Sequence, residues 1–432
     1  MVFHRSSYPC LYHSPFLYEK KINDYFCCLF YCLSMKSGFS AYVKYFFAFI
    51  LSLGGILLSR AAFAQPCHLR ISLVTVGVGD QLYATFGHTA IRVIDSSDNG
   101  DYIFNYGTFD FDTPHFYWKF IRGKLMYSLS VENFPDFMAE YYQEKRKVVE
   151  QLLNLTCAEK ERIWQFLQYN YLPQNRDYKY DFLFDNCSTR IRDIFVRVLG
   201  PGWKYPNIVP ESDLSFRTEI NRYLQNKPWE LLGINLMFGE STDDSMNSSQ
   251  IMFIPDYLAK AVGSSAINGK PLVAKTRVLY DPGPQPDNSF PFFLQPLFWL
   301  VILAVFIVVI SFNRHWTISK KLLPWIDRCL FFLSGLLGLF LLFMWFGTDH
   351  HVCRWNYNLL WAFPLNIIYS FYVHKNTSGV RKYAGWIIFL CFILLFGWYV
   401  LPQQIPLAVL PVIAMLFVRA WHILGSHKLA LR

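Results

Sequence analysis

Apolar residues are unevenly distributed along the 432-residue chain, and their distribution divides it into two parts. After about residue 289, five apolar runs are each long enough to cross a bilayer, which takes about 20 residues. They span residues 290–312, 322–346, 355–373, 384–401 and 405–424. Between residues 66 and 285, charged, glycine, proline and asparagine residues recur every few positions. The pattern predicts a water-facing domain at 66–285 and an all-α transmembrane domain of about five helices at 289–432.

Residues 35–64 show the order of a secretory signal peptide. Two lysines precede an apolar stretch, and an Ala-Phe-Ala site ending at Ala64 follows it. An uncleaved anchor helix is the alternative interpretation. Residues 1–34 have no place ahead of such a signal, so we expect them to be an upstream extension, with Met35 as the initiator.

Positive charges at the ends of the apolar runs predict their orientation. Basic residues follow the first and third runs and close the fifth: Arg314, Lys320, Lys321, Lys375, Arg381, Lys382, Arg419, His427, Lys428 and Arg432. In the turns at 347–354 and 402–404, Arg354 is the only residue with a full positive charge. The positive-inside rule therefore predicts a bacterial inner-membrane protein with domain 66–285 in the periplasm and a cytoplasmic C-terminus.

The same bias accounts for most of the formal net charge of +9, and hydrophobic residues make up 53% of the chain. No basic stripe with interleaved aromatic residues occurs in the water-facing part, so nucleic acid is excluded as a partner. Four cysteines lie outside the leader and the apolar runs: Cys67, Cys157, Cys187 and Cys353. The periplasm permits a Cys67–Cys157 bridge, which would leave Cys187 as a free thiol.

Within residues 66–285, short β-branched or alternating runs bounded by turn residues predict strands. They are residues 71–76, 89–94, 102–106, 125–131 and 148–153. Helical periodicity predicts helices at 114–122, 133–144, 157–171 and 187–199, with weaker signals near 213–226 and 255–262. Interspersed helices without regular βαβ alternation predict an α+β domain.

Cys187 is the first candidate for chemistry, because it opens the predicted helix 187–199. The unpaired N–H groups and the positive dipole of a helix N-terminus stabilise a thiolate, which is the attacking form of cysteine. A buried, unreactive thiol is the alternative interpretation. A free thiol in the periplasm and a histidine suited to act as its base favour the nucleophile.

His88 is that base, at the start of the predicted strand 89–94 and after Gly87. A histidine there would take the thiol proton and return it to a leaving group. Asn105, on the next strand in hairpin register, is the candidate that orients the imidazole ring, with Asp110 as the alternative. Either one is also acceptable as a turn residue. The side chain of Asn186 or the backbone N–H of Cys187 would act as the oxyanion donor.

This order of residues, histidine on an early strand and cysteine on a later helix, is the reverse of papain. It resembles the circularly permuted papain-like group that includes NlpC/P60-related hydrolases and lecithin:retinol acyltransferases. A closer resemblance, over nearly the whole exported chain, is to the Lnb family with its N-terminal periplasmic domain. The motifs that carry it are residues 86–92, 105–111, 178–182, 186–193 and 252–257.

The resemblance implies a lipoprotein N-acyltransferase with Cys187 as nucleophile and His88 as base, and no cofactor or metal. It implies a phospholipid acyl donor and a diacylglyceryl lipoprotein as acceptor. Arg92 and Arg190 lie in the same motifs and are candidate supporting residues. Asp185 departs from the family pattern, in which a second asparagine is common. Fold-level kinship does not fix the reaction, so a periplasmic cysteine peptidase or amidase and a non-catalytic membrane scaffold stay as alternatives.

The turn after the second apolar run concentrates polar residues at the outer face of the membrane. We expect His350, His351, Asn356 and Asn358 to contact lipid headgroups or to complete the active site. The alternative is an interfacial anchor whose tryptophans and tyrosine form an aromatic belt. A zinc site is disfavoured, because adjacent histidines lack the usual ligand spacing.

Overall fold

The computed structural model describes residues 45, 46, 48, 50, 67–284, 290–313, 315–375 and 377–425. The upstream extension and most of the signal peptide predicted above lie outside these residues, as do Arg314 and the last seven residues. Residues 68–432 form one compact unit, separate from residues 1–67.

A seven-stranded antiparallel sheet forms the framework of the water-facing domain, in the order β10-β5-β1-β2-β3-β4-β6. The five predicted strands are confirmed as β1 (Leu69–Val76), β2 (His88–Asp95), β3 (Gly100–Thr108), β4 (Met126–Asn133) and β5 (Val148–Leu153). Two edge strands, β6 (Asp177–Lys179) and β10 (Val273–Tyr280), were not predicted. A second small sheet pairs β7 (Trp203–Lys204), β8 (Ala266–Ile267) and β9 (Lys270–Pro271).

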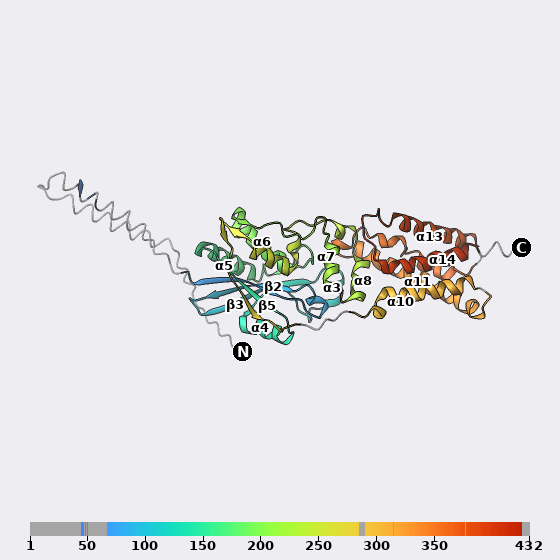
Figure 1. The fold of residues 1–432 in the computed structure, drawn as a ribbon, viewed down its shortest axis with the longest axis horizontal. Helices are drawn as coiled ribbons and strands as arrows, with labels where there is room; N and C mark the ends of the chain where they lie inside the picture. The colour runs from blue at the N-terminus through green and yellow to red at the C-terminus, as the bar shows by residue number, and fades with distance from the viewer. Residues whose placement is uncertain are drawn as a thin grey trace, which may run out of the picture. The chain divides into compact units, whose positions relative to one another are not determined.

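Helices cover both faces of the large sheet (Figure 1). On one face, α4 (Phe134–Gln143) packs against apolar residues of β1, β2, β3 and β5. On the other lie α5 (Cys157–Tyr171) and α6 (Cys187–Leu199), both with the predicted bounds. A capping box between Thr156 and Glu159 starts α5. The main core therefore lies between the sheet and α6.

The remaining helices of this domain are short. They are α3 (Phe116–Ile121), α7 (Phe216–Tyr223), α8 (Pro228–Met237) and α9 (Pro255–Gly263). Helix α8 was not predicted. Single 3-10 turns lie among them: η1 (Leu82–Ala84), η2 (Gly200–Gly202), η3 (Glu240–Asp243) and η4 (Ile251–Phe253).

The C-terminal region is helical. Its elements are η5 (Phe292–Leu294), α10 (Pro296–Phe312), α11 (Thr317–Phe346), η6 (His351–Cys353), η7 (Tyr357–Leu360), α12 (Asn366–Tyr372), α13 (Ser378–Gly397), η8 (Leu407–Val409) and α14 (Leu410–Gly425). Among the described residues, three helices are long and apolar enough to cross a membrane: α11, α13 and the segment Leu407–Gly425. Helix α10 is apolar but shorter. Five spanning helices therefore stay a prediction.

The third predicted span, residues 355–373, is not one continuous helix. It consists of η7, a turn and the seven-residue α12. Asn356 caps η7 by accepting the backbone N–H of Asn358 at 3.0 Å, and Pro364 cannot donate a backbone hydrogen bond. The apolar composition of this segment thus predicts a continuous helix, although residues within it interrupt one.

The end of α8 contacts the loops of the membrane region through backbone carbonyls. The Asn356 amide donates to the Leu236 carbonyl at 2.7 Å, and the Gln403 amide donates to the Phe238 carbonyl at 2.8 Å. Gly239 lies so close to the loop that a Cβ there would overlap with the Arg354 carbonyl group. The water-facing domain is therefore attached to the membrane region along this segment.

Gly239→Ala tests this attachment. We expect it to destabilise the full-length protein by about 2 kcal/mol, because the added methyl group overlaps with backbone that cannot rotate away. Gly233→Ala is the matched control, since Gly233 lies in α8 with no atom within 4 Å of an added Cβ. That change should leave the midpoint of thermal unfolding unchanged or raise it. Equal midpoints for the two variants would contradict the attachment.

Candidate active site

Cys187 is the first residue of α6, and a reciprocal capping box between Asn186 and Thr189 closes the N-terminus of this helix. The Asn186 side chain accepts the Thr189 backbone N–H at 2.9 Å, and the Thr189 hydroxyl accepts the Asn186 backbone N–H at 2.7 Å. The thiol is free of disulfide bonds and only 8% exposed. The helix N-terminus therefore holds a buried thiol where negative charge is favoured.

His88 is the first residue of β2, opposite Val76 of β1. Gly87 before it has φ +80°, and a Cβ at this position would lie 2.7 Å from the Val76 carbonyl oxygen. Only glycine meets both constraints without strain. The tight turn at Gly87 thus fixes the backbone position of His88, from which the imidazole extends toward α6.

The structure brings His88, Cys187 and Asn105 together. His88 Nε2 lies 2.6 Å from Asn105 Oδ1, and the imidazole is also hydrogen-bonded to the Cys187 thiol. Because the amide oxygen of Asn105 accepts, Nε2 carries the proton in the neutral ring, and Nδ1 is left as the basic nitrogen. Asn105 is itself 7% exposed and lies on β3, the strand next to β2. The predicted orienting residue therefore contacts the ring directly.

Opposing effects determine the protonation of this pair. Burial raises the pKa of the Cys187 thiol, but the charge of His88, its hydrogen bond and the Thr89 backbone N–H outweigh burial, so the pKa is lowered. Burial lowers the pKa of His88, but the thiolate and the bonds to Cys187 and Asn105 outweigh it, so the pKa is raised. Both shifts favour a thiolate–imidazolium pair.

Two further residues near the pair escaped the sequence analysis. The Asn105 amide donates to Glu132 of β4 at 3.4 Å, which extends the chain of contacts from Cys187 to a carboxylate. The Tyr178 side chain is 6% exposed, and its hydroxyl makes no hydrogen bond within the described part of the chain. A Cβ on Gly107 would stand 3.8 Å from Cys187 Cβ and 3.9 Å from that hydroxyl. The register of β3 with β4 offered a signal for Glu132. Tyr178 lies in the motif 178–182, but nothing in that motif indicates a hydroxyl beside the thiol.

Two predicted supporting residues have other roles. Both amide hydrogens of Asn186 are used, because its Nδ2 donates to the Phe182 and Phe253 carbonyls at 2.8 Å each. It is therefore a capping residue with no N–H left for an oxyanion. Asp110 is exposed, and its carboxylate accepts the Asp112 backbone N–H within a turn. The alternative interpretation of Asp110 as a turn residue describes the structure.

The two arginines support the framework instead of facing the thiol. Arg92 of β2 makes ion pairs with Asp101 of the neighbouring β3 at 2.6 Å and with Glu150 of β5, on the far side of β1, at 3.1 Å. Arg190 forms a bidentate pair with Asp185 at 2.6 and 2.7 Å, and its guanidinium lies 3.5 Å from the ring centre of Tyr178. Asp185, the residue that departs from the family pattern, therefore positions Arg190 over Tyr178.

The polar residues expected at the lipid interface fall into two groups. Asn356 and Asn358 are 3% and 0% exposed, so they do not face headgroups. Their side chains are used in the contact with α8 and in η7 because the backbone groups there need partners. The His350 imidazole donates from Nε2 to the Phe120 carbonyl at 3.2 Å, which links it to α3. His351 is exposed.

The geometry defines a membrane-attached domain with a buried Cys–His–Asn centre. Residues 61–218 match the model of the Lnb N-terminal periplasmic domain, and residues 287–428 match the Lnb transmembrane domain. The chain therefore belongs to the Lnb family. A periplasmic domain joined to a transmembrane domain suggests the inner membrane as its location. Neither the curated proteins nor the solved structures contain a significant match.

Alkylation of Cys187 tests the thiolate–imidazolium pair. We expect iodoacetamide to modify this thiol faster near neutral pH than an ordinary cysteine, because its lowered pKa leaves more thiolate. His88→Ala removes the opposing charge, so burial then dominates and the rate near pH 7 falls by about tenfold or more. The rates are measured by peptide mass spectrometry over a pH series that brackets neutrality.

Cys353 is the internal control for this experiment. It is 3% exposed, and burial raises its pKa to about 12. It should stay unmodified near neutral pH in both proteins. A Cys187 rate that is the same with and without His88 would contradict the pairing.

Proposed function

We propose that the protein is a lipoprotein N-acyltransferase that moves an acyl chain from a membrane phospholipid, through a thioester on Cys187, to the N-terminal amine of a diacylglyceryl lipoprotein. One observation carries the proposal: a buried cysteine at a helix N-terminus is hydrogen-bonded to a histidine that an asparagine orients. Membership of the Lnb family supports it. The order of His88, Asn105 and Cys187 along the chain also suits a permuted papain-like arrangement.

The reaction divides into two acyl transfers. The Cys187 thiolate attacks the ester carbonyl of the phospholipid, the bond to the glycerol oxygen breaks, and that oxygen takes the proton of the His88 imidazolium. A lysophospholipid leaves. The α-amine of the acceptor then attacks the thioester, the carbon–sulfur bond breaks, and the proton lost by the amine passes to His88. Because an α-amine has a pKa of about 8, a fair share of it is already nucleophilic at neutral pH.

A row of aromatic side chains favours a lipid as the acyl donor. Ring centres lie 5.7 Å apart for Phe116 and Phe109, 5.2 Å for Phe109 and Tyr127, and 4.3 Å for Tyr127 and Tyr180. Tyr180 in turn lies 3.7 Å from the position of a Cβ on Gly107, next to Cys187. The row joins α3 to the neighbourhood of the thiol through buried and partly buried aromatic side chains, which suit an acyl chain and give a polar peptide little to bind.

Helix α3 connects this row to the membrane. Tyr117, Trp118 and Phe120 are each more than half exposed on it. Trp118 stacks on Phe343 near the end of α11 at 5.8 Å. Exposed aromatic residues beside the end of an apolar helix are typical of the membrane interface. The acyl donor would therefore reach Cys187 from the outer leaflet beside α3.

Tyr178 is the oxyanion donor in this mechanism. Its hydroxyl is buried, makes no hydrogen bond within the described residues and lies near Cys187 across Gly107. Burial raises its pKa well above the usual range, so the group keeps its proton and donates. The Arg190 guanidinium stacks on the Tyr178 ring and helps to hold the phenol in place.

Removal of the nucleophile or the base should abolish acyl transfer. We expect Cys187→Ser and His88→Ala to lower the rate about a thousandfold or more without changing the amount of protein in the membrane. Mass spectrometry of lipoprotein N-termini, in cells that depend on this protein, gives the readout. Asp110→Asn is the control, because this exposed carboxylate lies in a turn and should be dispensable. Normal N-acylation in either active-site variant would refute the proposal.

A labelled phospholipid separates the acyltransferase from a cysteine peptidase built on the same residues. Incubation with the purified protein should give a hydroxylamine-sensitive acyl adduct on Cys187, since thioesters react with hydroxylamine. A peptidase would yield no such adduct and would cleave peptide substrates instead.

Tyr178→Phe should lower kcat about a hundredfold and leave KM for the phospholipid unchanged, because an oxyanion forms only after substrate binding. The folded protein loses no hydrogen bond, so its thermal unfolding midpoint should not fall. Tyr369→Phe is the matched control. It removes another buried hydroxyl without a hydrogen-bond partner among the described residues, but in the membrane region. An unchanged kcat in Tyr178→Phe would remove Tyr178 from the mechanism.

A further inference from the structure

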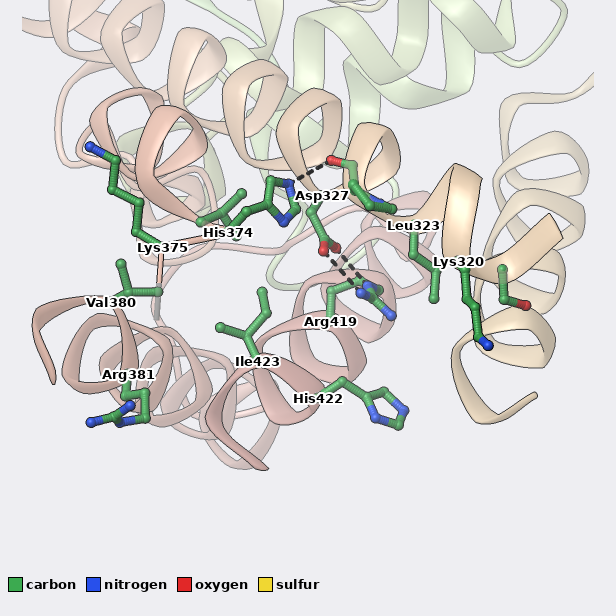
Figure 2. A pocket seen from close by; sticks show the side chains of 13 residues that line it. Lys320, Leu323, Asp327, His374, Lys375, Val380, Arg381, Arg419, His422 and Ile423 are labelled. Atoms are coloured by element: carbon green, nitrogen blue, oxygen red, sulfur yellow. Dashed lines mark hydrogen bonds and ion pairs between the residues drawn. The ribbon is translucent and has the colours of Figure 1, made fainter. Parts of the chain in front are cut away.

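A pocket of about 310 Å³ lies among the helices of the membrane region, far from Cys187. It is formed by the start of α11, the segment after α12, the start of α13 and the last turns of α14 (Figure 2). At its centre Arg419 points toward Asp327, and the two form a bidentate ion pair at 2.6 and 2.9 Å. Both side chains are buried, at 4% and 3% exposure.

The residues that line this pocket carry an excess of positive charge. Lys320, Lys375 and Arg381 line it together with Arg419, and among its described lining residues Asp327 is the only acidic one. Both carboxylate oxygens of Asp327 accept from Arg419, so they are not available to the other basic groups. Lys320 and Lys375 are exposed and long enough to close over a bound anion.

A second observation points independently to a polar ligand. Ser319 lines the pocket with 0% exposure, and its hydroxyl makes no hydrogen bond in the described part of the protein. A buried hydroxyl without a partner costs free energy, and a bound acceptor would satisfy it. Arg419 also has N–H groups to spare, because it uses three of five to bind Asp327 and Ser311.

The length of α11 locates the pocket relative to the bilayer. From Asp327 to Phe346 the helix rises about 30 Å, which is the thickness of a hydrocarbon core. Just beyond Phe346, the Gly347 carbonyl accepts a hydrogen bond from Arg122 of the periplasmic domain. The pocket therefore lies at the opposite face of the membrane, at the level of the cytoplasmic headgroups.

We propose that this pocket binds the phosphodiester headgroup of an anionic phospholipid from the cytoplasmic leaflet. The cluster of basic side chains and the Ser319 hydroxyl suit phosphate oxygens, and the position between membrane helices suits a lipid better than a free ion. A zwitterionic headgroup fits less well, because its ammonium group would meet the lysines. The proposal goes beyond the acyl transfer described above and does not depend on it.

Binding is tested with the purified full-length protein in nanodiscs, with dioleoylphosphatidylglycerol titrated into dioleoylphosphatidylcholine. The readout is the midpoint of thermal unfolding together with lipid retained in native mass spectrometry. We expect phosphatidylglycerol to raise the midpoint, and the pair Lys320→Gln with Lys375→Gln to weaken its apparent affinity about tenfold. Inorganic phosphate alone, added in phosphatidylcholine nanodiscs, should have little effect.

The matched control is the pair Lys321→Gln with Lys382→Gln. These lysines are also exposed, lie next in sequence to pocket residues and remove the same charge, but they do not line the pocket. Their affinity should stay within about twofold of the unmodified protein. Equal losses in both pairs would show surface electrostatics only and overturn the site, as would a phosphate effect that equals that of the lipid. Ser319→Ala, which adds no bulk, should weaken binding without lowering the midpoint in phosphatidylcholine.

Discussion

The meeting of the α6 N-terminus with the first residue of β2 is the contact on which the candidate site depends. Cys187 and His88 are almost a hundred positions apart, and glycine at 87 and 107 lets the backbone turn and the helix approach. The buried thiol would be neutral alone, because burial opposes its ionisation. The imidazole and the N-terminus of α6 reverse that preference. The contact between α6 and β2 therefore also makes the thiol reactive.

The sequence predicted those parts of the structure that follow from local pattern. Alternation predicted the five central strands, helical periodicity predicted both bounds of α5 and α6, and hairpin register predicted Asn105 beside His88. Partners distant in sequence decided the rest. Asn186 is not the oxyanion donor because its amide is used by the Phe182 and Phe253 carbonyls. Tyr178 was missed because a buried hydroxyl without a hydrogen-bond partner, here among the described residues, arises only in the folded domain. No local pattern carries that information.

The same limit explains the membrane region. Composition identified apolar segments well, yet residues 355–373 are apolar without forming a single helix. The position of Asn356 and Asn358 in a polar turn predicted contact with lipid, but backbone groups of α8 and η7 bond to their side chains. Polar side chains at a membrane surface can contact lipid headgroups or pair with buried backbone groups. The backbone groups take precedence here, because an unpaired carbonyl in a buried contact costs free energy.

The buried pair of Arg419 and Asp327 also has to satisfy polar groups that are removed from water. Two charges removed from water are costly, and their attraction offsets this only with good geometry and further hydrogen bonds. The bidentate contact and the Ser311 hydroxyl supply both for Asp327 and Arg419. Asp327 is the one acidic residue among the described residues that line the pocket, and Arg419 occupies both of its oxygens. The lining therefore keeps an excess of positive charge, at the end of α11 farthest from the periplasmic domain, and this charge suits a bound anion.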